Sequence, residues 1–202
     1  DFIIDNVKNG VKTVISTAAL TNIAKAFMKD KETMNNLDEL IIMGGSIFTP
    51  GTITPVAEFN IYCDPYAADF VMHQDIKITL VPTDIAHKVI LTKADLKNVK
   101  QTKEVEITKK MLNVYAEKLR NEKGIIGNPM HDPLAMGVAI DHSFIKTTPM
   151  NLHVETKGVY TKGMCVVERR PNKIKEVKPN VNVGLQVDSD RFISYLIEKL
   201  SE

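Results

Sequence analysis

The stretch VKTVISTAALTNIAKAFMK, residues 11–29, decides the expected fold because it sets a buried strand directly before a helix. Residues 11–17 are mostly apolar and β-branched, as in a strand that is covered on both faces. Residues 20–29 follow with apolar side chains at helical spacing, namely Leu20, Ile23, Ala24 and Phe27. We therefore expect a strand followed by a helix, the repeating unit of parallel sheets.

The same alternation continues along the chain. It predicts further strands at 39–45, 77–81 and 181–187, and further helices near the start and at 65–73, 104–120 and 191–200. The inner face of the long helix is expected to hold Val105, Thr108, Met111, Leu112, Tyr115 and Leu119. Asp64-Pro65 and Asp132-Pro133 both read as helix starts, in which Asp caps free N–H groups. These patterns predict one α/β domain over residues 1–202, with a largely parallel, mixed sheet flanked by helices.

Composition narrows the classes of partner. The 202 residues include 26 basic and 25 acidic side chains, a formal net charge of +1, so no global field attracts nucleic acid or an anionic membrane. Cys63 and Cys165 lie far apart, which argues against a disulfide framework or a structural zinc site and favours reduced, buried thiols. With no long apolar run and no secretion signal, we expect a cytoplasmic protein with a small-molecule partner.

Ligands of open parallel sheets collect beyond the carboxyl ends of the strands. The expected ends are residues 16–22, 43–46, 82–87 and, less clearly, 130–133. Thr17 is of interest for its backbone carbonyl, which can ligate calcium, although the same residue also suits a plain strand-to-helix turn. Met43 is most economically a core residue, but at a strand end it can line a pocket. Gly44-Gly45 is not a dinucleotide fingerprint.

Glu58 and Asn60 are candidates for binding a sugar. In an extended segment they would face the same side, and a carboxylate beside an amide offers acceptors and donors to vicinal hydroxyls. The alternative is that both side chains satisfy backbone groups in a turn before Asp64.

His131 and Asp132 form a second candidate pair. Asp132 can cap a helix or ligate a hard cation such as calcium, and His131 can donate a proton near neutral pH or be an ordinary, partly buried histidine. Asp84 and His87 also follow a strand, where loop hydrogen bonding is the simpler role.

Several segments, taken in order, resemble the inosine-uridine preferring nucleoside hydrolase family. They are TAALTNIA at 17–24, IMGG at 42–45, PVAEFNI at 55–61, Asp64-Pro65 and His131-Asp132-Pro133. The resemblance runs essentially end to end and implies a Rossmann-like fold. It also implies hydrolysis of ribonucleosides to ribose and free base with a bound calcium ion, and usually a homo-oligomer.

The resemblance also assigns roles by position. It implies that the Thr17 carbonyl and Asp132 ligate calcium, that Glu58 and Asn60 hold ribose hydroxyls and that Met43 lines the ribose side of the pocket. His131 would be the catalytic residue that protonates the departing base, with Asp84 and His87 in a supporting role. Base preference would depend on the region of Tyr115 and Arg120 and stays open.

One family feature is missing from this sequence. Relatives open with an Asp-rich cluster that supplies most calcium ligands, and neither Asp1 nor Asp5 matches it. Because calcium wants six to eight oxygens, we expect weak calcium binding and negligible turnover by this chain alone. Two alternatives to an enzyme lacking its N-terminal metal segment stay open: a non-catalytic ribose or nucleoside binder, and an assembly module.

Overall fold

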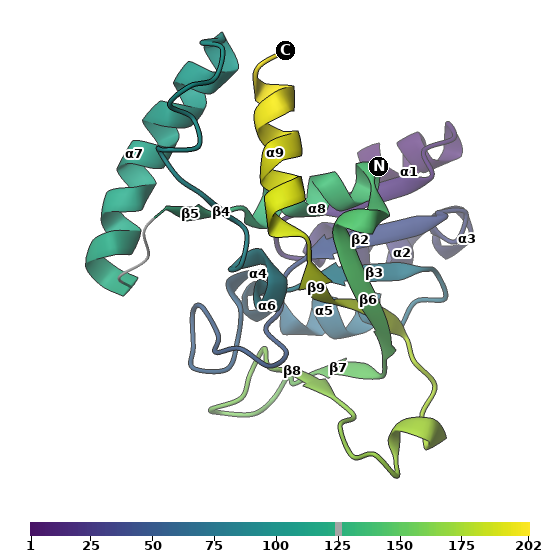
Figure 1. The fold of residues 1–202 in the computed structure, drawn as a ribbon. Coiled ribbons are helices and arrows are strands. Elements are labelled where there is room, and N and C mark those ends of the chain that lie inside the picture. The colour runs from purple at the N-terminus through teal and green to yellow at the C-terminus, as the bar shows by residue number, and fades with distance from the viewer. Residues whose placement is uncertain (124–126) are drawn as a thin grey trace.

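The protein is described by a computed structural model, which covers residues 1–123 and 127–202, with the side chains of 115–123 left out. Its main sheet has five strands in the order β1-β2-β3-β9-β6 (Figure 1). Their bounds are β1 Thr13–Ser16, β2 Glu39–Met43, β3 Ile78–Val81, β9 Val181–Val187 and β6 Ile145–Met150. The first four strands are parallel, and β6 pairs antiparallel with β9. The predicted α/β fold with a largely parallel, mixed sheet is confirmed.

Helices connect and cover these strands. They are α1 Phe2–Lys8, α2 Thr21–Lys29, α3 Lys31–Met34, α4 Phe59–Cys63, α5 Pro65–Met72, α6 Thr83–Ala86, α7 Lys103–Lys123, α8 His131–Ile140 and α9 Ser189–Leu200, with 3-10 turns η1 His142–Phe144 and η2 Ile174–Glu176. Two small antiparallel pairs lie outside the main sheet: β4 Ile90–Leu91 with β5 Asn128–Pro129, and β7 Leu152–Val154 with β8 Cys165–Val167.

The central strands β2 and β3 are buried along their whole length, and since successive side chains of a strand point to opposite sides, both faces of the sheet are covered there. Leu40 and Ile42 of β2 join the core formed with α1, α2 and α5, whereas Ile41 and Met43 join the core formed with α8 and α9. Figure 1 shows α8 on the side of the sheet opposite α5. This explains the continuous apolar run that predicted a buried strand.

The long helix α7 stands away from the sheet (Figure 1). Val105 and Leu112 are buried as expected, but Met111 is 67% exposed, so its assignment to the inner face was wrong. Neighbouring residues of a helix point about 100° apart, so Met111 faces solvent although the adjacent Leu112 is buried. The predicted inner positions of Tyr115 and Leu119 fall outside the described side chains.

Of the two helix starts predicted at Asp-Pro pairs, one is confirmed and the other is wrong. Asp64 caps α5 as predicted: its carboxylate accepts from the Ala67 amide at 3.0 Å and from the Thr21 hydroxyl at 2.5 Å. Helix α8 instead begins at His131, with Met130 at the N-cap, so Asp132 lies inside the first turn. The capping prediction for Asp132 was wrong because the helix starts two residues earlier than the Asp-Pro pair suggested, at His131 rather than at Pro133. Across the described parts of the chain, none of the helices is both long and apolar enough to cross a membrane.

Candidate functional site

The candidate site lies at the carboxyl edge of the main sheet, where α4 meets the ends of β1 and β2. The Asn60 side-chain amide donates to the backbone carbonyl of Met43 at 3.1 Å and lies 3.4 Å from that of Thr17. Thr17 directly follows β1, and Met43 is the last residue of β2. One amide therefore links two neighbouring strand ends and brings Asn60 into contact with both Thr17 and Met43.

The segment that holds Glu58 and Asn60 is helical rather than extended. Glu58 is the N-cap of α4 and Asn60 lies in its first turn, so the prediction of a shared extended face was wrong. A capping side chain turns back over the N–H groups of the first turn, which strand periodicity cannot anticipate.

The buried Glu58 carboxylate has a structural role. It accepts hydrogen bonds from the backbone amides of Gly45 and Asn60 at 2.9 Å and of Ile61 at 3.3 Å. Its Oε2 takes most of these bonds, while Oε1 receives only the shared bond from Asn60. Since a carboxylate oxygen has two lone pairs, Oε1 keeps capacity for one hydroxyl donor.

Gly44 and Gly45 allow this approach. A Cβ at Gly44 would lie 3.2 Å from Glu58 Oε2, and a Cβ at Gly45 would lie 3.0 Å from the Cys165 sulfur. Gly45 also has a φ of +80°, a left-handed conformation that favours glycine. The glycine pair thus lets the β2 backbone pass close to Glu58.

His131 and Asp132 open α8, which packs on β2. Met130, just before them, belongs to the same buried cluster as Met43, and its amide bonds the Val89 carbonyl beyond α6. The His131 ring packs edge-on against His87 with centroids 5.1 Å apart. The start of α8 is therefore directed to the same end of the sheet as Asn60.

Two acidic residues near this edge differ in environment. Partial burial raises the pKa of Asp132 above its ordinary value, because desolvation disfavours the charged carboxylate. Asp84 is buried and accepts from the backbone amides of Ile47 and Phe48 at 2.8 and 2.7 Å. Asp84 thus holds the loop after β2, the simpler of its two predicted roles.

The oxygen donors at this edge of the sheet suit part of the coordination shell of a calcium ion. The Thr17 carbonyl and the Asp132 carboxylate are hard oxygen donors, and a nearby cation would favour the charged form that partial burial of Asp132 disfavours. Calcium needs six to eight oxygens, so water, substrate hydroxyls or further protein groups would complete the shell.

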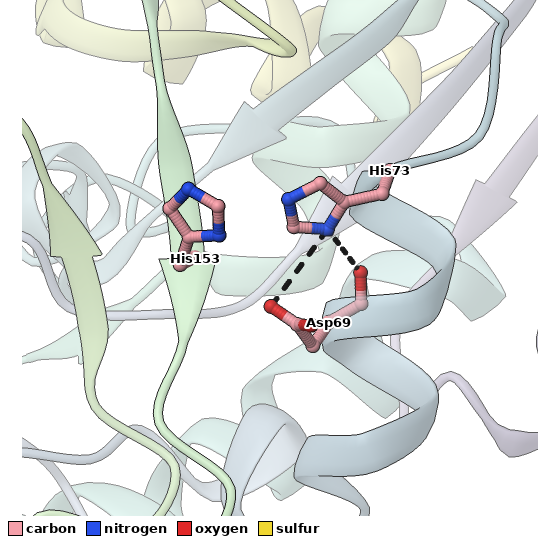
Figure 2. Close-up of side chains that lie close together, drawn as sticks. All are labelled: Asp69, His73 and His153. Atoms are coloured by element: carbon pink, nitrogen blue, oxygen red, sulfur yellow. Dashed lines mark hydrogen bonds and ion pairs between the residues drawn. The ribbon is translucent and has the colours of Figure 1, made fainter.

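The sequence alone did not reveal a second group of potential ligands. Asp69, His73 and His153 offer ligand atoms that all lie within 4.8 Å of one another (Figure 2). Asp69 and His73 are four residues apart along α5 and its C-cap, a spacing that puts two side chains on one helix face. His153 comes from β7, and only the tertiary structure brings it to that face.

This chain is similar to known proteins in both sequence and fold. Residues 1–194 match the family described as inosine-uridine preferring nucleoside hydrolase. The pyrimidine-specific ribonucleoside hydrolase RihA of Salmonella gallinarum is 34% identical over 191 residues, which cover 93% of this chain and 60% of that protein. The chain thus spans about 60% of the length of the curated relatives.

Two solved structures have the same fold as this chain. A plant nucleoside hydrolase superposes with a TM-score of 0.90 at 29% identity, covering all of this chain and 66% of its own. A purine-preferring ribonucleoside hydrolase from Gardnerella vaginalis gives 0.88 at 28% identity, covering all of this chain and 64% of its own.

Proposed function

Because this chain belongs to the inosine-uridine preferring nucleoside hydrolase family, we propose that it forms the ribose-binding side of an enzyme that hydrolyses the N-glycosidic bond of ribonucleosides. The observation that carries the proposal is the Asn60 amide held against the carbonyls of Thr17 and Met43, beside the buried Glu58. Polar groups fixed in this way bind a sugar without a further ordering cost.

In this proposal Glu58 and Asn60 bind ribose hydroxyls. Glu58 Oε1 accepts from one hydroxyl, and the Asn60 carboxamide, anchored through its nitrogen, presents its oxygen to another. Met43 is 3% exposed and lines the floor beneath the sugar. Three elements that are rigidly packed together thus set the sugar's position.

His131 is proposed as the proton donor to the departing base. Cleavage passes through an oxocarbenium-like state: water adds to the anomeric carbon and loses a proton, the bond to nitrogen breaks, and the base takes a proton, so that overall one water is consumed and the protein ends in its starting protonation state. An imidazole is suited to this transfer near neutral pH. His87, packed against the ring, positions His131 in the proposal.

We propose that the Thr17 carbonyl and Asp132 would hold the metal ion, with calcium matching their oxygen chemistry. A bound calcium would orient the ribose hydroxyls and the attacking water. Asp132→Asn should therefore weaken calcium binding in a calorimetric titration, a readout that does not depend on turnover.

Ligand binding tests the proposal directly. Ribose, inosine and uridine would be titrated into the purified chain with calcium while amide chemical shifts are followed, and release of free base would be measured by chromatography. We expect shifts around residues 17, 43 and 60, and at least about tenfold weaker binding in Asn60→Ala, because the anchored amide is lost. Comparing inosine with uridine decides base preference, since the two relatives above are named for opposite preferences.

Asn98→Ala is a matched control because Asn98 is exposed and far along the chain from the site. If neither ribose nor any nucleoside shifts these amides, or if Asn98→Ala weakens binding as much as Asn60→Ala, the proposed site is wrong. We also propose a homo-oligomer, which sedimentation velocity of the same sample would test.

A further inference from the structure

The group formed by Asp69, His73 and His153 lies at the opposite edge of the sheet from Asn60. Helix α5 begins beside α4 and ends before β3, so its C-terminal end is at the amino edge of the strands. Strand β6 runs antiparallel to β9 and delivers β7 to that same edge. Figure 2 shows the two imidazole rings facing one another, with the Asp69 carboxylate beside His73.

The hydrogen bond of His73 leaves one ring nitrogen suited to a metal. Its Nδ1 lies 2.6 Å from the Asp69 backbone carbonyl, which can only accept, so Nδ1 carries the proton. Nε2 then holds a lone pair, and in Figure 2 this nitrogen faces His153. Metal-ligating histidines commonly donate their other N–H to a carbonyl, which fixes the ring orientation.

His153 is oriented in the same manner. Its Nε2 lies 3.2 Å from the Asn151 side-chain oxygen, again an acceptor, so the proton is on Nε2 and the lone pair on Nδ1. The two rings pack with centroids 4.8 Å apart, close enough for both lone pairs to reach one ion.

The third donor, the Asp69 carboxylate, is held by the strand that carries His153. Asp69 Oδ1 accepts from the Val154 backbone amide at 2.8 Å. This bond ties α5 to β7 and keeps the carboxylate among the imidazoles. A carboxylate also supplies negative charge, which lowers the cost of placing a cation there.

Two further features favour a cation. His73 is the C-cap of α5, where the partial negative charge of a helix C-terminus attracts cations. The side chains of Asp69 and His73 are each 36% exposed, so an ion can reach them from solvent. Tetrahedral ligands on zinc at about 2.1 Å lie about 3.4 Å apart, so a bound ion would draw these ligand atoms closer together than their present span of 4.8 Å.

We propose that Asp69, His73 and His153 bind a divalent transition-metal ion of the zinc type, with a water in the fourth position. Two imidazole nitrogens and one carboxylate suit zinc, whereas calcium prefers an all-oxygen shell. The ion fastens β7, and with it the β7–β8 pair, to the end of α5. This site is independent of the proposed hydrolase function.

The test uses the whole chain in a Cys63→Ser background, since Cys63 is an exposed thiol that also binds zinc. Zn²⁺ would be titrated calorimetrically, and Co²⁺ would report tetrahedral geometry by its visible absorption. We expect one equivalent to bind and the melting temperature to rise with zinc concentration. His73→Gln and His153→Gln should each weaken binding at least about tenfold, because each removes one ligand.

Two control variants distinguish the proposed site from other histidines that can bind zinc. His142→Gln removes another exposed histidine that contacts a carboxylate, and His131→Gln tests the His87–His131 ring pair as an alternative zinc site. Both should bind Zn²⁺ as tightly as the background protein. The proposal is overturned if binding is unaffected by His73→Gln and His153→Gln, or if it is lost with His131→Gln instead. Loss of zinc binding in His73→Gln or His153→Gln would not bear on nucleoside binding, which the proposal places at the opposite edge of the sheet.

Discussion

At the scale of single residues, Glu58 shows how one side chain can serve both fold and site. Its carboxylate caps α4 and also reaches back to the Gly45 amide after β2, so it joins the two segments that surround the proposed ribose site. Three backbone N–H groups donate to this one carboxylate. The site therefore favours a negatively charged acceptor and disfavours a side chain that is itself a hydrogen-bond donor.

Glu58→Gln should therefore destabilise the fold. The new amide NH₂ group would face backbone donors inside a buried site, and we expect the free energy of unfolding to fall by about 1–3 kcal/mol. Urea denaturation monitored by circular dichroism measures the change. Glu104→Gln, an exposed substitution in the first turn of α7, is the control and should leave the urea midpoint unchanged. Equal midpoints for both variants would contradict the capping role.

The raised pKa of Asp132 predicts a pH dependence of stability. The folded state releases the Asp132 proton less readily than the unfolded chain, so stability falls as pH rises from about 4 through the folded pKa. Metal-free Asp132→Asn should then unfold at a higher temperature than the unaltered protein at neutral pH. The difference should disappear in acid, where the carboxyl is protonated in both states.

Thermal melts in a chelating buffer at pH about 3.5 and about 7 would check this. Added calcium should reverse the order at neutral pH, since only the carboxylate gains from the cation. If the variant is less stable in chelator at neutral pH, Asp132 contributes a favourable interaction that outweighs its desolvation.

At the scale of elements, α8 is positioned by its close packing against α9. A Cβ added to Gly137 would lie 2.4 Å from a ring carbon of Phe192, which is 1% exposed. Phe192 in turn packs edge-on against Phe144 with centroids 5.4 Å apart, so the ring has little freedom to move. The glycine therefore sets the distance between the two helices and the orientation of the α8 start.

Gly137→Ala should destabilise the protein despite the better helix propensity of alanine. Overpacking costs about 1–3 kcal/mol, whereas the propensity gain is about 1 kcal/mol, so the expected net change is a loss. Chemical denaturation measures it, with Met136→Ala, an exposed position on the same helix, as the control. A variant more stable than the unaltered protein would show that α9 moves away freely.

At the scale of the whole molecule, the two edges of one sheet hold different chemistry. The carboxyl edge gathers oxygen donors and amides from the ends of β1 and β2 and the starts of α4 and α8. The amino edge gathers two imidazoles and a carboxylate from the end of α5 and from β7. A parallel sheet separates these edges by the length of its strands, so a change at one edge need not disturb the other.

The amino-acid sequence by itself determined the order of the main elements, namely strands β1, β2, β3 and β9 and helices α2, α5, α7 and α9, and the burial of β2 on both faces. Each of these follows from local periodicity, as in residues 11–29, or from a short motif such as Asp64-Pro65. Segments that resemble a known family also led correctly to the family to which the chain belongs.

Only the tertiary structure decided that Glu58 caps α4, that Met111 faces solvent and that His153 meets His73. The physical reason is the same in all three cases. A cap depends on where the backbone turns, burial depends on what covers a helix face, and the 4.8 Å group joins residues 80 or more positions apart in the chain. Such contacts depend on the packing of distant elements, which a local pattern does not encode.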